Sequence, residues 1–310
     1  MQAALSGYFT IAVVIGVGAL AAQLRLLDET GRRVLSRLAF TIASPVLLFT
    51  LVSTANLQHL FSGTLLVSAL AIVLAALAYL AVARVLLGPG RLADRVVGTL
   101  CAAYTNAGNL GLPIAAYVLG DMTWMAPILL IQVGILQPTA LALLDASAAH
   151  HAGRRLRPLS YVTLPLRNPI TVGTLAGLAV NLSGWTVPPL VLQPMTMIAG
   201  LAVPSMLIAF GVSLRLDPRP GIGPHARELV VVSLVKVLVH PAIALALGWW
   251  LGLATSQLLA VTVLAALPTA QNIYLISGRY QVQHRLSRDA IFVTTLASIP
   301  VIIAASTWLR

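Results

Sequence analysis

Charged residues are scarce in this sequence, and acidic residues are the scarcest of them. Only 9% of the 310 residues are charged, with 8 Asp or Glu against 19 Lys or Arg. Hydrophobic residues make up 59%, and the mean hydropathy is +0.94. In a soluble globular domain about a quarter of the residues are charged. The composition therefore excludes that class and indicates a polytopic membrane protein.

Cysteine occurs once, at Cys101, which excludes an intramolecular disulfide and any zinc or redox motif built on cysteine. An intramembrane hydrolase would need a Ser–His pair or paired Asp residues. Ser44, Ser205 and His240 have no evident orienting acid in the sequence. We therefore expect no metal, no cofactor and no enzymatic activity.

Stretches without Asp, Glu, Lys or Arg predict where the chain crosses the membrane. They cover residues 1–24, 38–83, 96–120, 122–144, 168–214, 237–278 and 290–309. About 20 apolar residues cross a bilayer as a helix. The stretches 38–83, 168–214 and 237–278 are long enough for two helices each, which gives ten in all; the eighth helix begins near Glu228. All 8 acidic residues lie outside these stretches, which argues against a carboxylate relay for protons or sodium.

Basic residues alternate between the connections of these helices. Of the 19 Lys and Arg, 17 lie in the connections after the first, third, fifth, seventh and ninth helices, and the other connections hold none. This positive-inside pattern predicts a multi-pass protein of the cytoplasmic membrane with both termini outside. Its basic residues, with a net charge of +11, face the lipid bilayer surface. No nucleic-acid partner is expected, since that role needs basic residues clustered on a soluble surface.

The longest polar connection, from Asp145 to Arg167, divides the chain into two halves. We predict a first five-helix repeat at residues 1–145, a cytoplasmic linker at 146–166 and a second five-helix repeat at 167–310. Five is odd, so the second half enters the membrane from the opposite side. The predicted fold class is an all-α polytopic membrane protein with two inverted repeats, the plan of many secondary transporters. Pro45 and Pro204 lie near the middle of the second and seventh helices, where a single Pro can also be a simple kink.

The fourth and ninth helices carry matching interruptions. The fourth contains "NAGNLGLP", which ends at Pro113, and the ninth contains "LPTAQNIY", which begins at Leu267. Paired interruptions of this kind point to the binding site of a transporter, because broken backbone is tolerated at membrane depth only beside protein or a water-filled cavity. Amides are costly in lipid, and here they favour a ligand site over packing between helices. They belong to Asn106, Asn109, Gln271 and Asn272.

Lys236 and His240 lie inside the eighth helix. Lys236 is about 13 Å along the helix from its start near Arg227, by the helical rise, and a Lys at such depth is by default functional. The alternative is that its ammonium snorkels to the cytoplasmic interface. His240 follows one turn later on the same face. The pair could exchange a proton, or the His could simply be hydrogen-bonded.

Four motifs together resemble the auxin efflux carrier family, and the resemblance covers all ten predicted helices. They are "NAGNLGLP" in the fourth helix, "LPTAQNIYLISGRYQV" in the ninth, "NPITVGTLAGL" in the sixth and "KVLVHPAIAL" in the eighth. Bacterial members of the family include malonate/malate permease-like proteins. The family is similar in fold to bile acid symporters and sodium/proton antiporters. This implies a scaffold from helices 1, 2, 6 and 7 and a transport domain from helices 3–5 and 8–10.

The resemblance also implies how the interrupted helices are arranged. In the family they unwind and cross, and the crossing prolines match Pro113 and Pro268. The substrate-facing amides of the fourth helix match Asn106 and Asn109. The long cytoplasmic loop of the plant carriers is missing here, so their phosphoregulation and auxin specificity are not expected.

Together these features predict a secondary transporter of a small organic anion. Half-helix N-termini carry about +0.5 charge each, and amide donors beside them favour a carboxylate. We expect elevator-like alternating access, as efflux or uniport. The alternatives are a sodium- or proton-coupled symporter of the same fold with a different substrate, or a channel or receptor; a homodimer is left open. The predicted substrate-binding residues are Asn106, Asn109, Gly111, Pro113, Pro268, Gln271, Asn272, Lys236 and His240.

Overall fold

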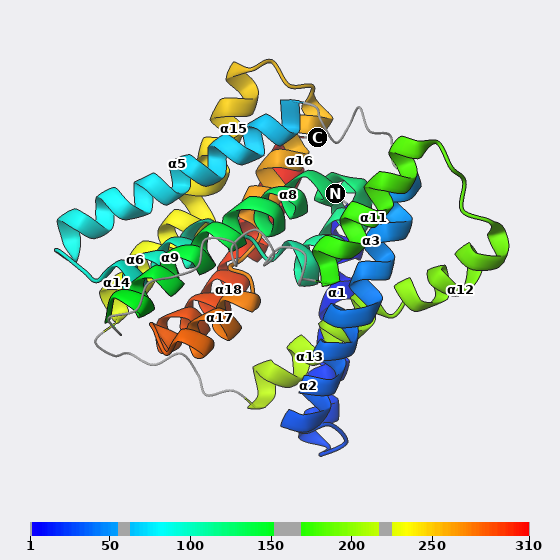
Figure 1. The fold of residues 1–310 in the computed structure, drawn as a ribbon, viewed down its shortest axis with the longest axis horizontal. Coiled ribbons are helices and arrows are strands. Elements are labelled where there is room, and N and C mark those ends of the chain that lie inside the picture. The colour runs from blue at the N-terminus through cyan, green and yellow to red at the C-terminus, as the bar shows by residue number, and fades with distance from the viewer. Residues whose placement is uncertain (1, 55–62, 152–168, 217–224, 310) are drawn as a thin grey trace. The chain divides into compact units, whose positions relative to one another are not determined.

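The computed structural model describes residues 2–54, 63–151, 169–216 and 225–309. These residues form helices and their connections, with no strand among them, so the all-α prediction is confirmed (Figure 1). The extended backbone recorded in them is an isolated antiparallel bridge between Thr105 and Thr269. Six helical runs in the described ranges are long and apolar enough to cross a membrane: Glu29–Thr54, Gly63–Leu86, Met122–Ala148, Pro189–Leu216, Ala226–Trp250 and His284–Trp308. The predicted linker 146–166 lies mostly outside the described residues.

The chain forms two compact units, each built from both halves of the sequence. The first comprises Met1–Leu60, Gly108–Ala126 and Thr163–Pro218. Its helices are α1 (Gln2–Gln23), α2 (Glu29–Leu38), α3 (Ser44–Thr54), the short α7 (Leu112–Ile114), α11 (Pro169–Ser183), α12 (Pro189–Ala199) and α13 (Ala202–Leu216). Wider π-helical turns at Ala39–Ala43 and Ala115–Leu119 and a short turn at Met122–Trp124 join some of them.

Glycines allow two helix pairs of the first unit to approach closely. A Cβ on Gly18 would lie 2.2 Å from Ile208 O. A Cβ on Gly211 would lie 2.0 Å from Ile15 O, so the backbones of α1 and α13 are in contact. At Gly173, α11 approaches a carbonyl oxygen of α3 in the same way. Such small residues stabilise helix pairs in lipid, where apolar side chains gain little by leaving the solvent.

The two prolines of the second and seventh predicted helices lie at helix irregularities. The π-helical turn Ala39–Ala43 immediately precedes the segment that contains Pro45. Pro204 lies in the first turn of α13 rather than at mid-helix, because the helical run bends at Gly200 and Leu201. Proline is tolerated in a first turn, since its missing N–H would have no helical partner there.

The second compact unit comprises Phe61–Ala107, Pro127–Val162 and Arg219–Arg310. Its helices are α5 (Gly63–Leu86), α6 (Leu92–Ala103), α8 (Met125–Ile131), α9 (Gln137–His151), α14 (Ala226–Leu234), α15 (His240–Trp250), α16 (Thr255–Ala266), α17 (Asn272–Tyr280) and α18 (His284–Trp308). π-Helical turns at Gln132–Leu136 and Val235–Val239 connect α8 to α9 and α14 to α15. Helix α15 packs against α16 and α5.

One segment is grouped differently from what the family resemblance implies. The second part of the fourth predicted helix, Gly108–Ala126, belongs to the first unit, where it contacts α1. The resemblance instead places the whole fourth helix in a transport domain with the third and fifth helices. Because this helix is broken, the part before the break packs in the second unit and the part after it packs in the first unit.

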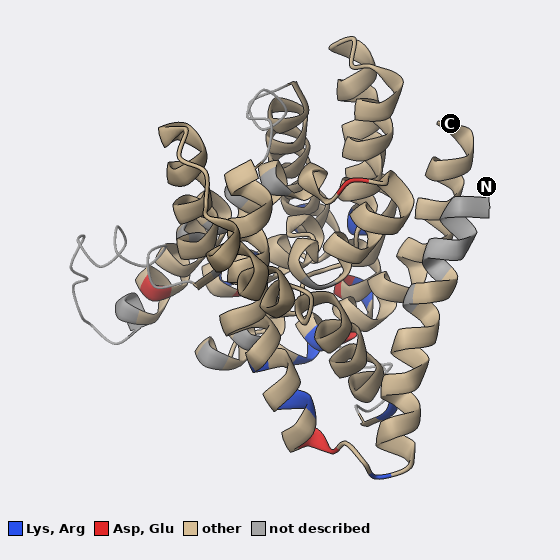
Figure 2. Cartoon of the chain, turned by 90° about the vertical axis from the view of Figure 1, so that its right-hand side faces the viewer, with Lys and Arg blue, Asp and Glu red and all other residues tan. Residues whose placement is uncertain are grey.

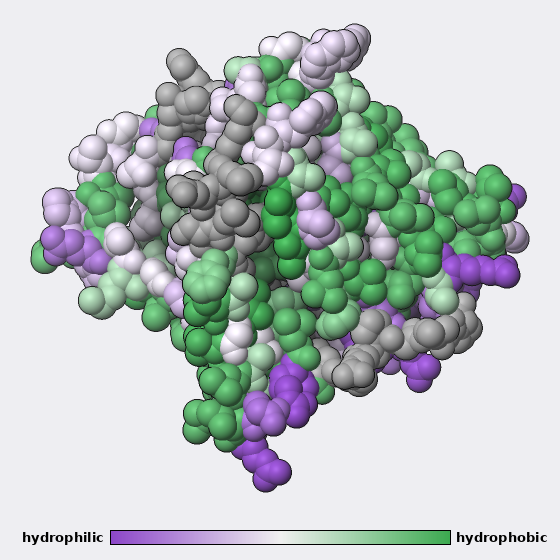
Figure 3. All heavy atoms as spheres, turned by 180° about the vertical axis from the view of Figure 1, so that it is seen from behind, coloured by the Kyte–Doolittle hydropathy of each residue, from purple (hydrophilic) through white to green (hydrophobic). Residues whose placement is uncertain are grey.

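Hydrophobic side chains cover much of the surface, and charged residues lie mainly near helix ends. Figure 3 shows broad hydrophobic areas, and Figure 2 shows long stretches of helix without charge. On α5 the exposed residues Leu66, Leu70, Val73 and Leu77 follow helical spacing and form one outward apolar row. An apolar face of this extent is typical of contact with lipid.

Two acidic residues directly beside the charge-free stretches belong to long apolar helices. Asp145 lies in α9, and Asp289, which is 7% exposed, lies in α18. Both have partners: Tyr280 Oη donates to Asp145 Oδ1 at 2.6 Å, and Arg288 pairs with Asp289 at 2.6 Å. A helix can continue past a charge when a partner compensates for the lost water, so a charge-free stretch underestimates the length of the helix.

Gly211→Ala should destabilise the first unit. The added Cβ would lie 2.0 Å from Ile15 O, so α13 has to move away from α1, and overpacking of this kind costs about 1–3 kcal/mol. We expect a lower midpoint of thermal unfolding in detergent. Gly16→Ala is the matched control, because a Cβ there has nothing within 4 Å. Equal midpoints for the two variants would contradict the close approach.

Candidate functional site: the two helix breaks

The segments that follow α6 and α16 leave the helical conformation and pair with each other. The Asn106 N–H donates to Pro268 O at 2.7 Å. The Ala270 N–H donates to Tyr104 O at 3.2 Å. Backbone polar groups find no water in the bilayer core and have to be satisfied within the protein. The two breaks therefore depend on each other, because each supplies hydrogen-bond partners that the other lacks.

Side chains satisfy further polar groups at the breaks. The Thr269 hydroxyl donates to Cys101 O at 2.6 Å, and the Thr269 N–H donates to Thr294 Oγ1 at 3.0 Å. Gln132 Nε2 donates to the hydroxyl of Thr105. Cys101 O belongs to the last turn of α6, where carbonyls have no helical partner, so Thr269 of one break caps the helix that leads into the other.

The local sequence explains why the helices stop here. Pro268 has no N–H to donate and restricts the residue before it, while Thr and Asn side chains compete with helical backbone bonds. Pro113 plays no such part, because it lies beyond the break, in the helical segment α7. The chain is already helical again at Ala107–Gly111. The break in the fourth helix therefore lies at the start of its motif.

Three amides and a tyrosine meet at the beginning of α17. Asn272 Nδ2 donates to Gln137 Oε1 at 3.2 Å, and Tyr104 Oη donates to the same oxygen at 3.0 Å. Gln271, Asn272 and Gln137 are partly exposed, whereas Tyr104 is 3% exposed. The hydrogen bonds among these groups join neutral partners. The cluster thus offers amide donors and acceptors without an acidic residue in it.

Sequence reasoning missed Gln132 and Gln137, both of which belong to the fifth predicted helix. Gln132 is 1% exposed and reaches one break, and Gln137 holds Asn272 beside the other. The signal was present: two amides lie within the charge-free stretch 122–144. The same desolvation argument that selected the amides of the fourth and ninth helices applies to them.

Lys236 is buried against the end of α16. Its Nζ donates to Ala265 O at 2.9 Å and lies 3.0 Å from His240 Nδ1, and the two side chains are 0% and 1% exposed. Snorkelling to the interface is therefore wrong for this residue. Ala265 O is one of the carbonyls that the end of α16 leaves without a helical partner, and Lys236 supplies a donor for it.

The other predicted site residues fall into two groups. Asn106, Pro268, Gln271 and Asn272 lie at the breaks within the second unit. Asn109, Gly111 and Pro113 belong to the first unit, in helical segments. The side chain of Asn109 lies outside the described side chains. Lys236 and His240 lie at the end of α16, which leads into the break that begins at Leu267.

The sequence matches a known family over almost its whole length. The family model described as "Membrane transport protein" matches residues 5–152 and 157–305. The chain belongs to this family. It is the auxin efflux carrier family that the four motifs resemble, so the protein is a membrane transporter and not an enzyme.

Two relatives of this transporter cover most of it. A protein of Rhizobium meliloti (strain 1021) named "Putative malonate transporter" is 28% identical over 288 residues, 90% of this chain and 88% of its own. A protein of Methanothermobacter thermautotrophicus (strain Delta H) named "Uncharacterized transporter" is 24% identical over 295 residues, 94% of this chain and 93% of its own. The similarity thus includes both helix breaks.

The burial of Lys236 can be checked by chemical labelling, because it is the sole Lys of the transporter. We expect an amine-reactive succinimidyl ester to leave Lys236 unmodified in the folded protein, since its Nζ is buried and bonded to Ala265 O. Peptide mapping by mass spectrometry measures the modified fraction. The protein unfolded in detergent and denaturant is the positive control. Labelling of the folded protein at the rate of the unfolded one would contradict the contact.

Proposed function

We propose that this membrane transporter moves a small organic anion, a carboxylate, across the cytoplasmic membrane. The observation that carries the proposal is the cluster of partly exposed amides at the beginning of α17. Helix-interrupting residues and buried amides are costly in a membrane. Their concentration at one place therefore calls for a ligand that uses them.

The amide cluster suits a carboxylate. Gln137 makes both of its recorded hydrogen bonds through Oε1, which leaves the N–H donors of its Nε2 for a ligand. Asn272 uses one N–H of its amide in the same cluster. The N-terminal end of α17 adds partial positive charge at the same place. A carboxylate accepts several such donors at once.

Lys236 and His240 act indirectly in this proposal. Because Lys236 Nζ donates to Ala265 O, it holds the end of α16 in place and so supports the break that begins at Leu267. These residues therefore belong to the support of the site rather than to its contacts with substrate.

A relative supports a small dicarboxylate as the substrate. The relative named for malonate shares 28% identity over most of both chains, and malonate is a small dicarboxylate. The fold supports movement by alternating access. Each compact unit contains segments from both halves of the sequence, and the two helix breaks depend on each other. Both are features of elevator-like transporters with inverted repeats. In this proposal the breaks are the crossing point of the fourth and ninth helices, and both termini lie on the outer side of the cytoplasmic membrane.

A proton-coupled symporter is the second candidate. It is favoured by the contact of 3.0 Å between Lys236 Nζ and His240 Nδ1, which lets the two groups share a proton. Purified protein in liposomes distinguishes the two, because a symporter acidifies the vesicle interior when substrate enters, whereas a uniporter does not.

Malonate should bind the purified transporter, and neutral or cationic analogues of the same length should not. We expect malonate to raise the midpoint of thermal unfolding, since a ligand at 100 times its Kd stabilises the folded state by about 2.7 kcal/mol. Malonamide and 1,3-diaminopropane are the matched controls. Stabilisation by the diamine without stabilisation by any carboxylate would overturn the assignment to anions.

Asn272→Ala and Gln137→Leu should each raise the Kd of malonate about tenfold, which corresponds to about 1.4 kcal/mol. Each variant removes donors at the start of α17, and isothermal titration calorimetry measures the affinity. Asn181→Ala is the control, because Asn181 is an amide of the first unit that donates to Val52 O. Wild-type affinity in both site variants would show that these amides only pack helices together.

A further inference from the structure

Two side-chain contacts join α9 and α17 at matching positions. At the first residue of each helix Asn272 Nδ2 donates to Gln137 Oε1 at 3.2 Å. Eight residues later in each helix Tyr280 Oη donates to Asp145 Oδ1 at 2.6 Å. Both contacts bridge a sequence separation of 135, so the two helices run in the same direction and in register. At 1.5 Å per residue the contacts lie about 12 Å apart along the helices.

These two contacts matter because α17 is short. It has nine residues, and a helix of this length is not stable by itself in water. Its close neighbours are α18 and α6, while its connection to α9 is made through the polar side chains. Helix α9 also packs against α6, so α6 brings the two helices together, and the two side-chain contacts set the register directly between them.

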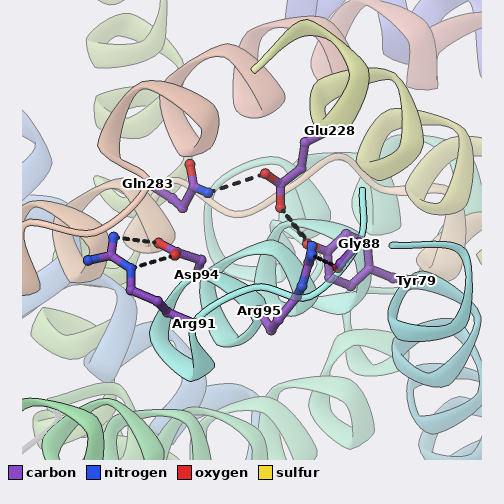
Figure 4. A network of polar contacts seen from close by, with 7 residues as sticks. All are labelled: Tyr79, Gly88, Arg91, Asp94, Arg95, Glu228 and Gln283. Carbon is purple, nitrogen blue, oxygen red and sulfur yellow. Dashed lines mark hydrogen bonds and ion pairs between the residues drawn. The ribbon is translucent and has the colours of Figure 1, made fainter. Parts of the chain in front are cut away.

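The turn after α17 is fixed to the rest of the second unit. Gln281 and Gln283 adopt left-handed backbone conformations, with φ of 54° and 49°, which are strained for residues other than Gly and persist only where the surroundings enforce them. Gln283 Nε2 donates to Glu228 Oε2 at 3.2 Å (Figure 4). This bond connects the turn to the first turn of α14.

Glu228 is itself held from two other helices. Its Oε1 accepts a hydrogen bond from Tyr79 Oη at 2.7 Å and lies 3.7 Å from an Arg95 nitrogen (Figure 4). Arg95 also donates to Gly88 O at 2.6 Å. A Cβ on Gly98 would lie 1.8 Å from Tyr79 Oη, so the absence of a side chain at Gly98 makes room for this hydroxyl. The end of α17 is thus connected to a rigid group of α5, α6 and α14.

We propose that Asp145 and Tyr280 are a positioning pair for the amide cluster. Their contact lies eight residues after Gln137 and Asn272 and fixes the register of α9 and α17. Gln137 and Asn272 therefore meet at the first residues of the two helices. A phenol donating to a carboxylate is a strong, charge-assisted hydrogen bond. Neither residue touches the substrate. The inference rests on the proposed function, because the amides it positions are the proposed carboxylate ligands.

Tyr280→Phe removes only the hydroxyl and should raise the Kd of malonate about tenfold, since losing a charge-assisted hydrogen bond is of that size. Asp145→Leu should have the same effect. Asp145→Asn should lose less affinity than Asp145→Leu, because its amide oxygen can still accept from Tyr280 although it carries no charge. Tyr117→Phe, at an exposed tyrosine of the first unit, is the matched control and should leave the Kd unchanged.

A coupling measurement separates positioning from a general structural effect. If Tyr280 acts through Gln137 and Asn272, then Tyr280→Phe should raise the Kd by less in a Gln137→Leu background than in the wild type, because the effects of residues in one network are not additive. Independent, additive losses in the double variant would overturn the proposal.

The sole cysteine gives a readout that needs no substrate. Cys101 is 0% exposed, and its carbonyl accepts from Thr269 at the break, one turn before Tyr104. Tyr104 in turn donates to Gln137. Loss of the register should loosen this region, so Tyr280→Phe should speed alkylation of Cys101 by N-ethylmaleimide severalfold, with Tyr117→Phe at the wild-type rate. Unchanged alkylation in Tyr280→Phe would overturn the positioning role even if malonate proved not to bind.

Discussion

The pairing of the two helix breaks is the constraint on which the second unit depends. At membrane depth an unsatisfied backbone group costs several kcal/mol, and each break uses the other for part of its backbone hydrogen bonds. Asn106 and Pro268 therefore bond across the breaks, as do Ala270 and Tyr104. A change that displaced one segment would leave polar groups of both without partners, so α6 and α16 have to end together in space although they are far apart in sequence.

The same constraint accounts for the unusual number of polar side chains in this apolar protein. Thr269 satisfies the last turn of α6, and Lys236 satisfies the last turn of α16. Each break is thus capped from outside its own helix. The amides of Gln137 and Asn272 extend this network to a partly exposed place. The groups that stabilise the breaks and the amides that we propose as ligand contacts thus belong to one hydrogen-bond network.

Different contacts hold the helices of the two compact units together in lipid. In the first unit Gly18, Gly211 and Gly173 bring helix backbones into contact, which gives dispersion energy without polar groups. In the second unit α17 is positioned by the side chains of Asp145 and Gln137. Polar contacts have directional preferences that close apolar packing lacks. In our proposal the second unit presents donors to a small anion, and that directionality serves this role.

The sequence by itself determined the class of protein, its helical nature, and that the fourth and ninth predicted helices are interrupted beside amides such as Asn106 and Asn272. These features are local, because apolar length sets a span and Pro, Gly, Asn and Thr disrupt a helix wherever they occur. Only the tertiary structure decided the partners. It paired Lys236 with Ala265 rather than with the interface, brought Gln137 to Asn272, and placed Pro113 beyond the break. It also kept Asp145 and Asp289 inside apolar helices by giving each a partner. The physical reason is that a buried polar group is tolerated only with a partner, and here most partners lie on a different helix, where no local pattern can identify them.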